Sequence, residues 1–342
     1  MTENQKYYTV RFLSQSEYEN WDRFISESEN AGLFFTVHWA MVIRQVFSRN
    51  FKILALLKDE EIQAGFLHWP KSFLGFQMIT RAPVTPYQDF VFKKSTKEKT
   101  SARAAEYHEL SNLLLEHLQK EYSHIDMAST PDRADIRPYT WKNFNSIPKY
   151  TYRFRLLPFE ELKAQFSQSL RRKIKKYTSE FEAVKSSETN SMADMVTDSY
   201  RHHGIEPPVT PAQLQKLFSV LADEDWAHFY YLQKDDKPYA GLLLLEDEHR
   251  VYSLFAGAGS THRSEFVTEY LYTECMKQQS FAGKQFDFLG ANTKDFEQFK
   301  RSFGGELQVY YELNYTRGKI LRFLSSLRRK QVLLKRGIRG KS

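Results

Sequence analysis

Short apolar runs separated by polar turns fill the first half of the chain. The run Phe51–Leu57, the acidic turn K-D-E-E and the run Ile62–Trp69 predict a β-hairpin. A further strand is expected at Phe73–Thr80, a helix at Ala104–Glu121 and a strand at His124–Ala128. This order predicts a mixed α/β (α+β) module, in which helices flank a mostly antiparallel sheet.

The second half repeats this plan. Lys58-Asp59-Glu60 and Ala64-Gly65 have counterparts 176 residues later, in Lys234-Asp235-Asp236 and Ala240-Gly241. In both halves a helix and an Asp-bearing strand follow the hairpin, so tandem duplication is the better interpretation. With a boundary in Pro131–Pro148, we expect modules at 1–148 and 149–315 and a tail at 316–342.

One stretch near the end of the second module combines a carboxylate with a lysine. Gln285–Leu289 is typical of a strand, carries Asp287 and ends at Gly290. Asp295–Phe303 predicts a helix with phenylalanines on one face and Lys300 at the border of that face. Such an arrangement suits the floor of a cleft, although a core strand with a packing helix has the same pattern.

The letters of this stretch, F-D-F-L-G and F-E-Q-F-K-R-S-F-G, resemble a signature of the Fem family of acyltransferases. The resemblance implies two GNAT-like modules and acyl transfer to an amine. It places a functional lysine at Lys300, for which we expect contact with the reacting carbonyl or its oxyanion. It also places an aspartate at Asp287, which either acts in catalysis or holds backbone N–H groups at the strand end.

The loop Thr80–Asp89 resembles the segment that lines the acceptor pocket of the peptidoglycan-bridge enzymes in this family. Arg81 and Tyr87 match it as substrate-binding candidates. The acid of the family pattern is replaced by Pro86, and Asp89 is a candidate substitute. The change puts the cross-bridge reaction in doubt, but not acyl transfer in general.

Two further groups are candidates for ligand binding. Arg171 and Arg172 begin a run of five cations in six positions, which either contacts phosphate or forms a solvated helix face. Gly257 and Gly259 follow an apolar strand, where a glycine-rich loop binds the pyrophosphate in enzymes that use acyl-CoA. The basic pattern of that loop is not matched, so a tight turn without a ligand is the favoured interpretation.

Composition limits the function classes. The chain has 342 residues, 41% of them hydrophobic, which excludes a disordered chain. No apolar run could span a bilayer, and the polar N-terminus lacks the apolar core of a signal peptide, so we expect a cytoplasmic protein. The single Cys275 excludes an internal disulfide and a cysteine-based zinc site, and we predict no metal.

The net charge of +7 comes from the tail, where ten Lys or Arg and no acid follow from residue 316 on. The tail contains a basic amphipathic stripe. It suits peripheral contact with the inner face of a membrane, contact with tRNA, or docking on the second module.

We therefore expect an N-acyltransferase that forms an amide on an amino sugar or another small-molecule or lipid-linked amine of the cell envelope. Acyl-CoA is the first choice of donor, and aminoacyl-tRNA for cross-bridge synthesis is the second. A non-catalytic membrane- or RNA-associated GNAT-fold module is the third alternative. The oligomeric state is not indicated by the sequence.

Overall fold

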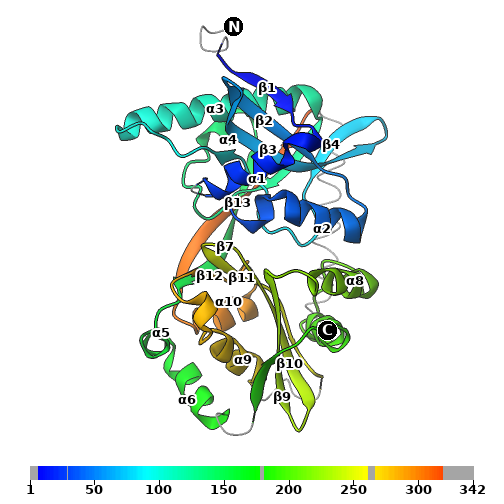
Figure 1. Cartoon of the computed structure of the whole chain (residues 1–342), viewed down its shortest axis with the longest axis vertical. Coiled ribbons are helices and arrows are strands. Elements are labelled where there is room, and N and C mark those ends of the chain that lie inside the picture. Colours follow the sequence, from blue (N-terminus) through cyan, green and yellow to red (C-terminus); the bar gives the residue numbers. More distant parts are fainter. Residues whose placement is uncertain (1–6, 29, 178–180, 261–265, 319–342) are drawn as a thin grey trace. The chain divides into compact units, whose positions relative to one another are not determined.

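The computed structural model describes residues 7–28, 30–177, 181–260 and 266–318 (Figure 1). The chain divides into two compact units. Among the described residues, unit 1 contains those up to Lys149 and 310–318, and unit 2 contains Tyr150–Val309. The last strand therefore ends in unit 1, whereas the sequence-based division kept residues up to 315 in the second module. Almost all of the basic tail lies outside the described residues.

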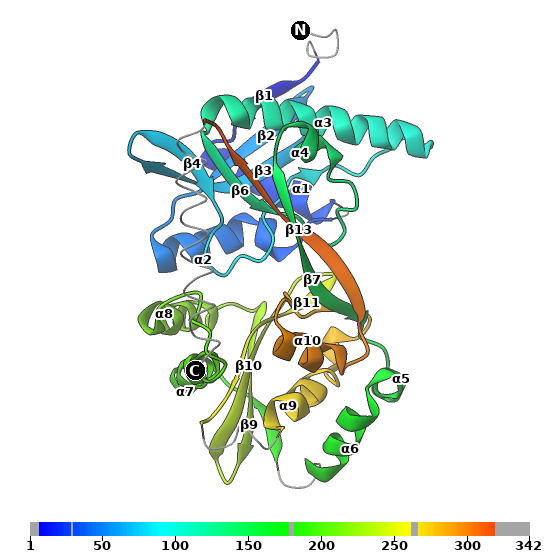
Figure 2. The ribbon, with the colours of Figure 1, turned by 180° about the vertical axis from the view of Figure 1, so that it is seen from behind.

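Unit 1 is a sheet with helices on both faces, α1 and α2 on one and α3 and α4 on the other (Figures 1 and 2). Its strands are β1 (Thr9–Phe12), β2 (Lys52–Lys58), β3 (Glu61–Phe73), β4 (Phe76–Thr80), β5 (Val91–Phe92) and β6 (His124–Ala128), with the first part of β7 (Asn145–Arg155) and the last part of β13 (Glu306–Thr316). Its helices are η2 (Gln15–Glu17), α1 (Tyr18–Ser26), η3 (Leu33–Phe35), α2 (Val37–Phe47), α3 (Thr100–Glu121) and α4 (Arg137–Trp141).

Unit 2 has the same order of elements after two additional helices. Its strands are the last part of β7, β8 (Glu182–Lys185), β9 (Ala227–Lys234), β10 (Lys237–Glu246), β11 (Arg250–Ala258), β12 (Gln285–Asp287) and the first part of β13. Its helices are α5 (Phe159–Gln165), α6 (Gln168–Tyr177), α7 (Asn190–His202), α8 (Pro211–Leu221), α9 (Val267–Cys275), η5 (Gln279–Phe281) and α10 (Lys294–Arg301).

The two sheets share one topology, which confirms the predicted tandem fold. The order β1-β2-β3-β4-β6 in unit 1 corresponds to β8-β9-β10-β11-β12 in unit 2. The pairs β4–β6 and β11–β12 are parallel, and the other described pairs within these runs are antiparallel.

The duplicated hairpins agree in detail. Asp59-Glu60 and Asp235-Asp236 form the two turns with positive φ angles. In unit 1 a bulge follows the pair Leu56↔Ala64, and the same bulge follows its counterpart Leu232↔Ala240 in unit 2. A shared bulge at the same offset is a stronger sign of duplication than the matched letters, because bulges are specific features of a fold.

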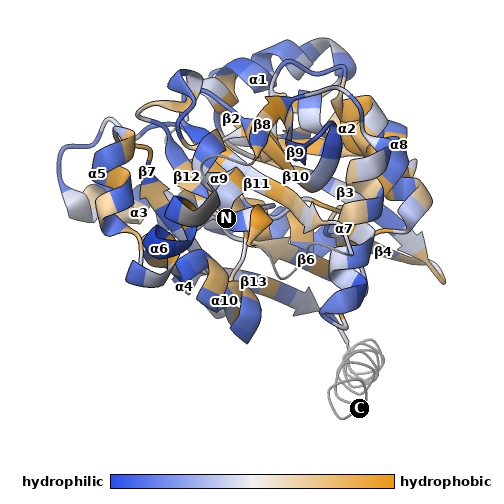
Figure 3. Ribbon diagram, turned by 90° about the horizontal axis from the view of Figure 1, so that it is seen from below, coloured by the Kyte–Doolittle hydropathy of each residue, from blue (hydrophilic) through white to orange (hydrophobic). Residues whose placement is uncertain are grey.

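Each unit has its own hydrophobic core. The core of unit 1 lies where β2, β3 and β6 meet α3, and includes Phe66 and Leu114. The core of unit 2 lies where β10, β11 and β12 meet α9, and includes Leu242 and Phe286. Figure 3 shows the apolar residues concentrated on the strands, while α6 is mainly hydrophilic. These cores follow the alternation of the strands.

The strand predicted at Phe73–Thr80 is in fact a hairpin. β3 continues to Phe73, and the chain turns at Leu74-Gly75 into β4. Pro70 lies inside β3, one residue beyond the predicted end of the run at Trp69. It is tolerated because β2 pairs with β3 only as far as His68, so Pro70 needs no ladder bond on that side.

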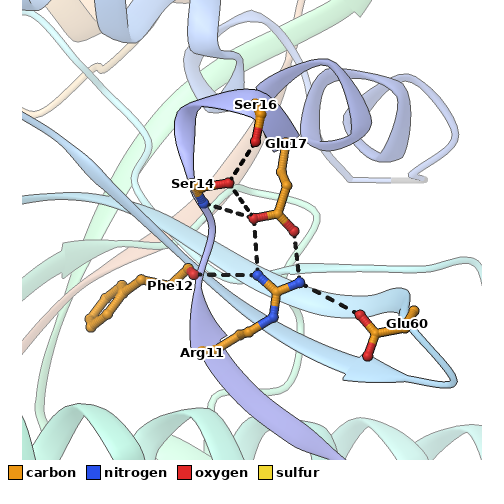
Figure 4. A network of polar contacts seen from close by, with 6 residues as sticks. All are labelled: Arg11, Phe12, Ser14, Ser16, Glu17 and Glu60. Carbon is orange, nitrogen blue, oxygen red and sulfur yellow. Dashed lines mark hydrogen bonds and ion pairs between the residues drawn. The ribbon is translucent and has the colours of Figure 1, made fainter.

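A network of polar contacts fixes the beginning of unit 1 (Figure 4). Arg11 donates to both carboxylate oxygens of Glu17, at 3.0 and 2.7 Å. The backbone N–H of Ser14 donates to the same carboxylate at 2.8 Å. These bonds hold the pKa of Glu17 at about 2, with Arg11 as the main cause. β1 is thereby tied to the first turn of the helix that follows it.

Two glycines of unit 2 allow α7 to lie close to the sheet. Gly241 and Gly257 face each other across β10 and β11. A Cβ atom at Gly257 would lie 2.5 Å from the backbone oxygen of Met195 in α7. At Gly241 it would lie 3.0 Å from the side chain of Met192. Only the second neighbour can move aside without shifting the backbone.

We predict that Gly257→Ala lowers the free energy of unfolding by about 1–3 kcal/mol, the usual cost of overpacking. Gly241→Ala is the matched control, with a smaller loss because a methionine side chain can adjust. Urea unfolding of both variants measures the difference. Equal losses would contradict the packing role of Gly257.

Candidate functional site

The two parallel strands of unit 2 separate after a short common stretch. Their pairs are Arg250↔Gln285, Val251↔Phe286 and Tyr252↔Asp287. β12 ends there, whereas β11 continues to Ala258. Ligands of open α/β sheets bind beyond the carboxyl ends of such strands, so the residues that follow Asp287 are a candidate site.

Asp287 is fully buried at the point of separation, and its carboxylate accepts hydrogen bonds from side-chain and backbone donors. Thr151 Oγ1 donates to Oδ1 at 2.8 Å, and Arg153 Nε donates to Oδ2 at 2.7 Å. The backbone N–H of Leu289 also donates to Oδ1, at 2.8 Å. This arrangement matches the structural alternative, in which the aspartate holds the backbone at the strand end.

The turn after β12 is fixed by these bonds in an unusual conformation. Leu289 and Gly290 have φ angles of 53° and 107°. The N–H of Gly290 donates to Thr151 Oγ1 at 3.2 Å. A leucine in the left-handed region is held only when its surroundings require it, and here Asp287 and Thr151 supply that requirement.

Lys300 of α10 points inward to this turn. Its Nζ donates to the carbonyl oxygen of Phe288 at 2.7 Å, and also to that of Gly290. The rings of Phe288 and Phe296 lie 5.8 and 5.7 Å from the ammonium. Burial lowers the pKa of Lys300 to about 8, and the nearby charge of Asp287 opposes part of that shift. The structure therefore places Lys300 and Asp287 at one turn.

A cleft of about 420 Å³ lies on the other side of α10. Its lining comes from the start of α6, from α9 and from α10: Ser167, Ser169, Leu170, Lys173, Glu269, Asp295, Gln298, Phe299, Arg301 and Ser302. Lys173 Nζ lies 3.9 Å from Glu269 Oε1. Burial raises the pKa of Glu269, because the long ion pair compensates only part of the lost hydration.

The predicted cations Arg171 and Arg172 are exposed on α6 and do not line this cleft. Lys173, the next residue, lines it instead. Sequence reasoning missed Glu269 and Lys173 because their partnership joins two helices that are far apart in the chain. The run of cations indicated the helix, but not which of its residues faces inward.

The candidates from the loop of unit 1 have structural partners. Arg81 pairs with Glu312 at 3.1 Å and lies 3.6 Å from Asp126. Tyr87 is buried, and its ring packs against that of Tyr310. These two residues support the loop from inside unit 1.

Asp89 is fully buried and accepts hydrogen bonds from Arg133 Nε at 3.0 Å and from the Tyr139 hydroxyl at 2.6 Å. It also accepts from the backbone N–H of Phe90. These donors do not leave the Asp89 carboxylate pointing at a substrate pocket. Its partner Arg133 had no recognisable signal in the sequence.

The glycines proposed for a pyrophosphate loop are differently placed. Gly257 lies inside β11 against α7, and not in a loop. Gly259 donates its N–H to the carbonyl oxygen of Tyr239 at 2.9 Å and so extends the sheet. Residues 261–265, the remainder of that loop, lie outside the described residues.

The described residues contain no group of three or more His, Cys, Asp or Glu placed to hold a metal ion. In the same residues, no helix is long and apolar enough to cross a membrane.

We predict that Asp287→Asn lowers the free energy of unfolding by about 3–5 kcal/mol, because Arg153 would remain buried without its anion. Asp295→Asn is the control, since its side chain is 73% exposed. Chemical denaturation of both variants measures the two losses. A small loss for Asp287→Asn, equal to that of the control, would show that this carboxylate is not the anchor of the turn.

Comparison with known proteins agrees with this geometry. Residues 164–301 match the family model described as the acetyltransferase (GNAT) domain. No curated protein sequence matches the chain significantly.

Solved structures extend the likeness to almost the whole chain. A structure of FemX superposes with a TM-score of 0.68 at 13% identity, over 92% of this chain and 99% of that one. The C-terminal domain of a putative lysylphosphatidylglycerol synthetase from Agrobacterium fabrum gives 0.54 at 13% identity, over 92% and 95%. A tandem GNAT protein from the clavulanic acid biosynthesis pathway gives 0.53 at 7%, over 91% and 99%.

At these identities the structural matches establish the fold, while the family model identifies the domain in unit 2. Residues 164–301 therefore match a GNAT acetyltransferase domain, and the chain has a fold like those of FemX and the tandem GNAT protein, in agreement with the expected Fem-like tandem GNAT fold.

Proposed function

We propose that the protein transfers an acyl group from acyl-CoA to the amine of a sugar-linked or lipid-linked precursor of the cell envelope. The observation that carries this proposal is the Lys300 ammonium, held at the turn where β11 and β12 separate. The matched acetyltransferase domain supports acyl-CoA as the donor. The fold shared with FemX and with the lysylphosphatidylglycerol synthetase domain supports an envelope-related acceptor.

The reaction requires a neutral amine to attack a thioester carbonyl, whose oxygen then gains negative charge. A lysine has three N–H donors, and the two carbonyl bonds of Lys300 use two of them. We assign the third to the carbonyl oxygen of the donor, where a cation stabilises the developing oxyanion. The carbon–sulfur bond breaks as the amide forms, and the thiol of CoA leaves.

Asp287 fits a positioning role better than that of a proton acceptor. Both of its oxygens already accept hydrogen bonds, and the carboxylate fixes the turn that holds Lys300. Exchange of a proton with substrate would require breaking this network. In the proposed mechanism Asp287 therefore acts through the backbone.

The cleft between α6, α9 and α10 lies across α10 from Lys300, so it is a candidate binding site for a part of the acceptor remote from the reacting amine. Its volume suits a sugar-sized group, and Glu269 places a carboxylate among three serine hydroxyls. A carboxylate favours an amine or hydroxyl group over a phosphate.

The donor is tested with the purified full-length protein, labelled acetyl-CoA or tRNAs charged with labelled amino acids, and an envelope extract. We expect label to pass from acetyl-CoA into the extract, and this transfer to stop when the amines of the extract are first blocked with acetic anhydride. Transfer from charged tRNA alone would contradict the proposed donor. No transfer from either would favour a non-catalytic module.

The role of Lys300 predicts a loss of turnover with rising pH. The cation is lost above pH of about 8, so kcat should fall there. This fall in kcat would not result from a loss of stability, because deprotonation of Lys300 does not destabilise the folded protein. Its pKa in the folded protein lies below the ordinary 10.5, so its contribution to stability increases between these two pH values.

Lys300→Met should lower kcat by about 10²-fold or more at neutral pH. Lys294→Met, on the exposed side of the same helix, is the control and should keep wild-type turnover. Steady-state kinetics across the pH range measure both effects. Turnover by Lys300→Met close to that of the control would remove Lys300 from the reaction.

A further inference from the structure

The tip of the β3–β4 hairpin in unit 1 exposes large apolar side chains. Phe73, Leu74 and Phe76 are 54%, 77% and 39% exposed. Figure 1 shows the hairpin as the light-blue arm beside the β4 label. Three such residues at one turn form a local apolar surface of the kind that marks an interaction site.

The turn itself is not built for stability. Leu74 and Gly75 have φ angles of 48° and 79°. Two-residue turns with two positive φ angles favour Asn-Gly or Asp-Gly. The duplicated hairpins follow this preference at their first position, with Asp59 and Asp235. Leucine is strained in this backbone conformation, and Leu74 is too exposed for burial to offset that strain. Contact with something outside the chain would explain a leucine at this position.

One face of the hairpin is apolar at the tip and carries a lysine further from the tip. Phe73 pairs with Phe76, and Lys71 pairs with Met78 two residues further from the tip. Because side chains alternate along a strand, these four lie on one face. The step from Leu74 to Lys71 is three residues, or about 10 Å. This distance agrees with the depth to which interfacial segments bury their apolar side, with the lysine reaching the headgroups.

The surrounding charge is positive. Residues 62–80 contain one cation, Lys71, and no acid. The N–H of Ser123 donates to Gln77 in β4, and the N–H of Arg317 donates to Ser123, so the described chain ends beside this hairpin. The sequence that continues from there, residues 319–342, has nine Lys or Arg and no acid. A lysine beside an apolar tip complements an anionic lipid surface.

The size of the tip also favours a bilayer over a protein. The exposed parts of the three side chains amount to roughly 300 Å², since an aromatic side chain carries about 150–250 Å². A stable protein–protein interface buries about 800 Å² on each partner. A lipid surface can surround a small projecting tip without matching its shape.

We propose that the tip of this hairpin, residues 73–76, inserts into the headgroup region of an anionic phospholipid bilayer. Lys71 then contacts lipid phosphates beside the inserted rings. This surface is separate from the Lys300 turn, and the proposal does not depend on the acyl donor or acceptor.

Flotation of the full-length protein with phosphatidylcholine vesicles, with and without phosphatidylglycerol, tests the proposal. We expect the wild type to bind the anionic vesicles. Leu74→Asn combined with Phe73→Thr should weaken this binding by about tenfold or more, given the apolar area removed. The substitution creates an Asn-Gly turn and keeps a β-branched residue in β3, so the fold should be retained.

Met41→Gln is the matched control, because Met41 is a 43% exposed apolar residue on α2 of the same unit. It should bind as the wild type does. A second readout is Leu74→Trp, whose fluorescence should shift to the blue on anionic vesicles. The proposal would be overturned if the wild type did not bind the vesicles, or if the hairpin variant bound them equally well. It would also be overturned if the wild type self-associated in solution without binding vesicles and the hairpin variant abolished this self-association.

Discussion

The buried contact between Asp287 and Arg153 determines the geometry of the candidate site. An ion pair removed from water is costly unless further hydrogen bonds satisfy both partners. Here Thr151 and the Leu289 N–H complete the carboxylate. The same bonds hold the turn that gives Lys300 its two carbonyl partners. The position of one lysine therefore depends on an aspartate that it does not directly pair with.

Unit 1 contains a comparable buried aspartate–arginine contact, but without a lysine at the turn that it fixes. Asp89 is buried with Arg133 and Tyr139, and it fixes the loop that follows β4. Both aspartates stood out in the sequence as chemical candidates, and in both cases the structure gives the carboxylate an arginine partner. The two units thus have similar scaffolds, but among the described residues only the turn after β12 combines the anchor with an inward lysine of lowered pKa.

The sequence predicted those features that depend on local pattern. The turns at Asp59 and Asp235 and the alternation of the flanking strands were sufficient for the duplicated hairpins and the fold class. The motif around Lys300 indicated the correct strand and helix. Partners were not predictable, because Arg153, Arg133 and Glu269 become neighbours of their sites only through tertiary folding. The role of Gly257 was not predictable for a different reason. The sequence does not distinguish a glycine required for close packing from one whose backbone binds a phosphate.

The pKa of Lys300 is the quantity on which the account depends most directly. It can be followed by NMR titration of the labelled lysine side chains, with Lys300→Met to assign the signal. The account predicts a midpoint near pH 8 and a shift of this signal when acetyl-CoA is added. A midpoint near the ordinary 10.5, with no response to the donor, would contradict a buried lysine at the reacting carbonyl.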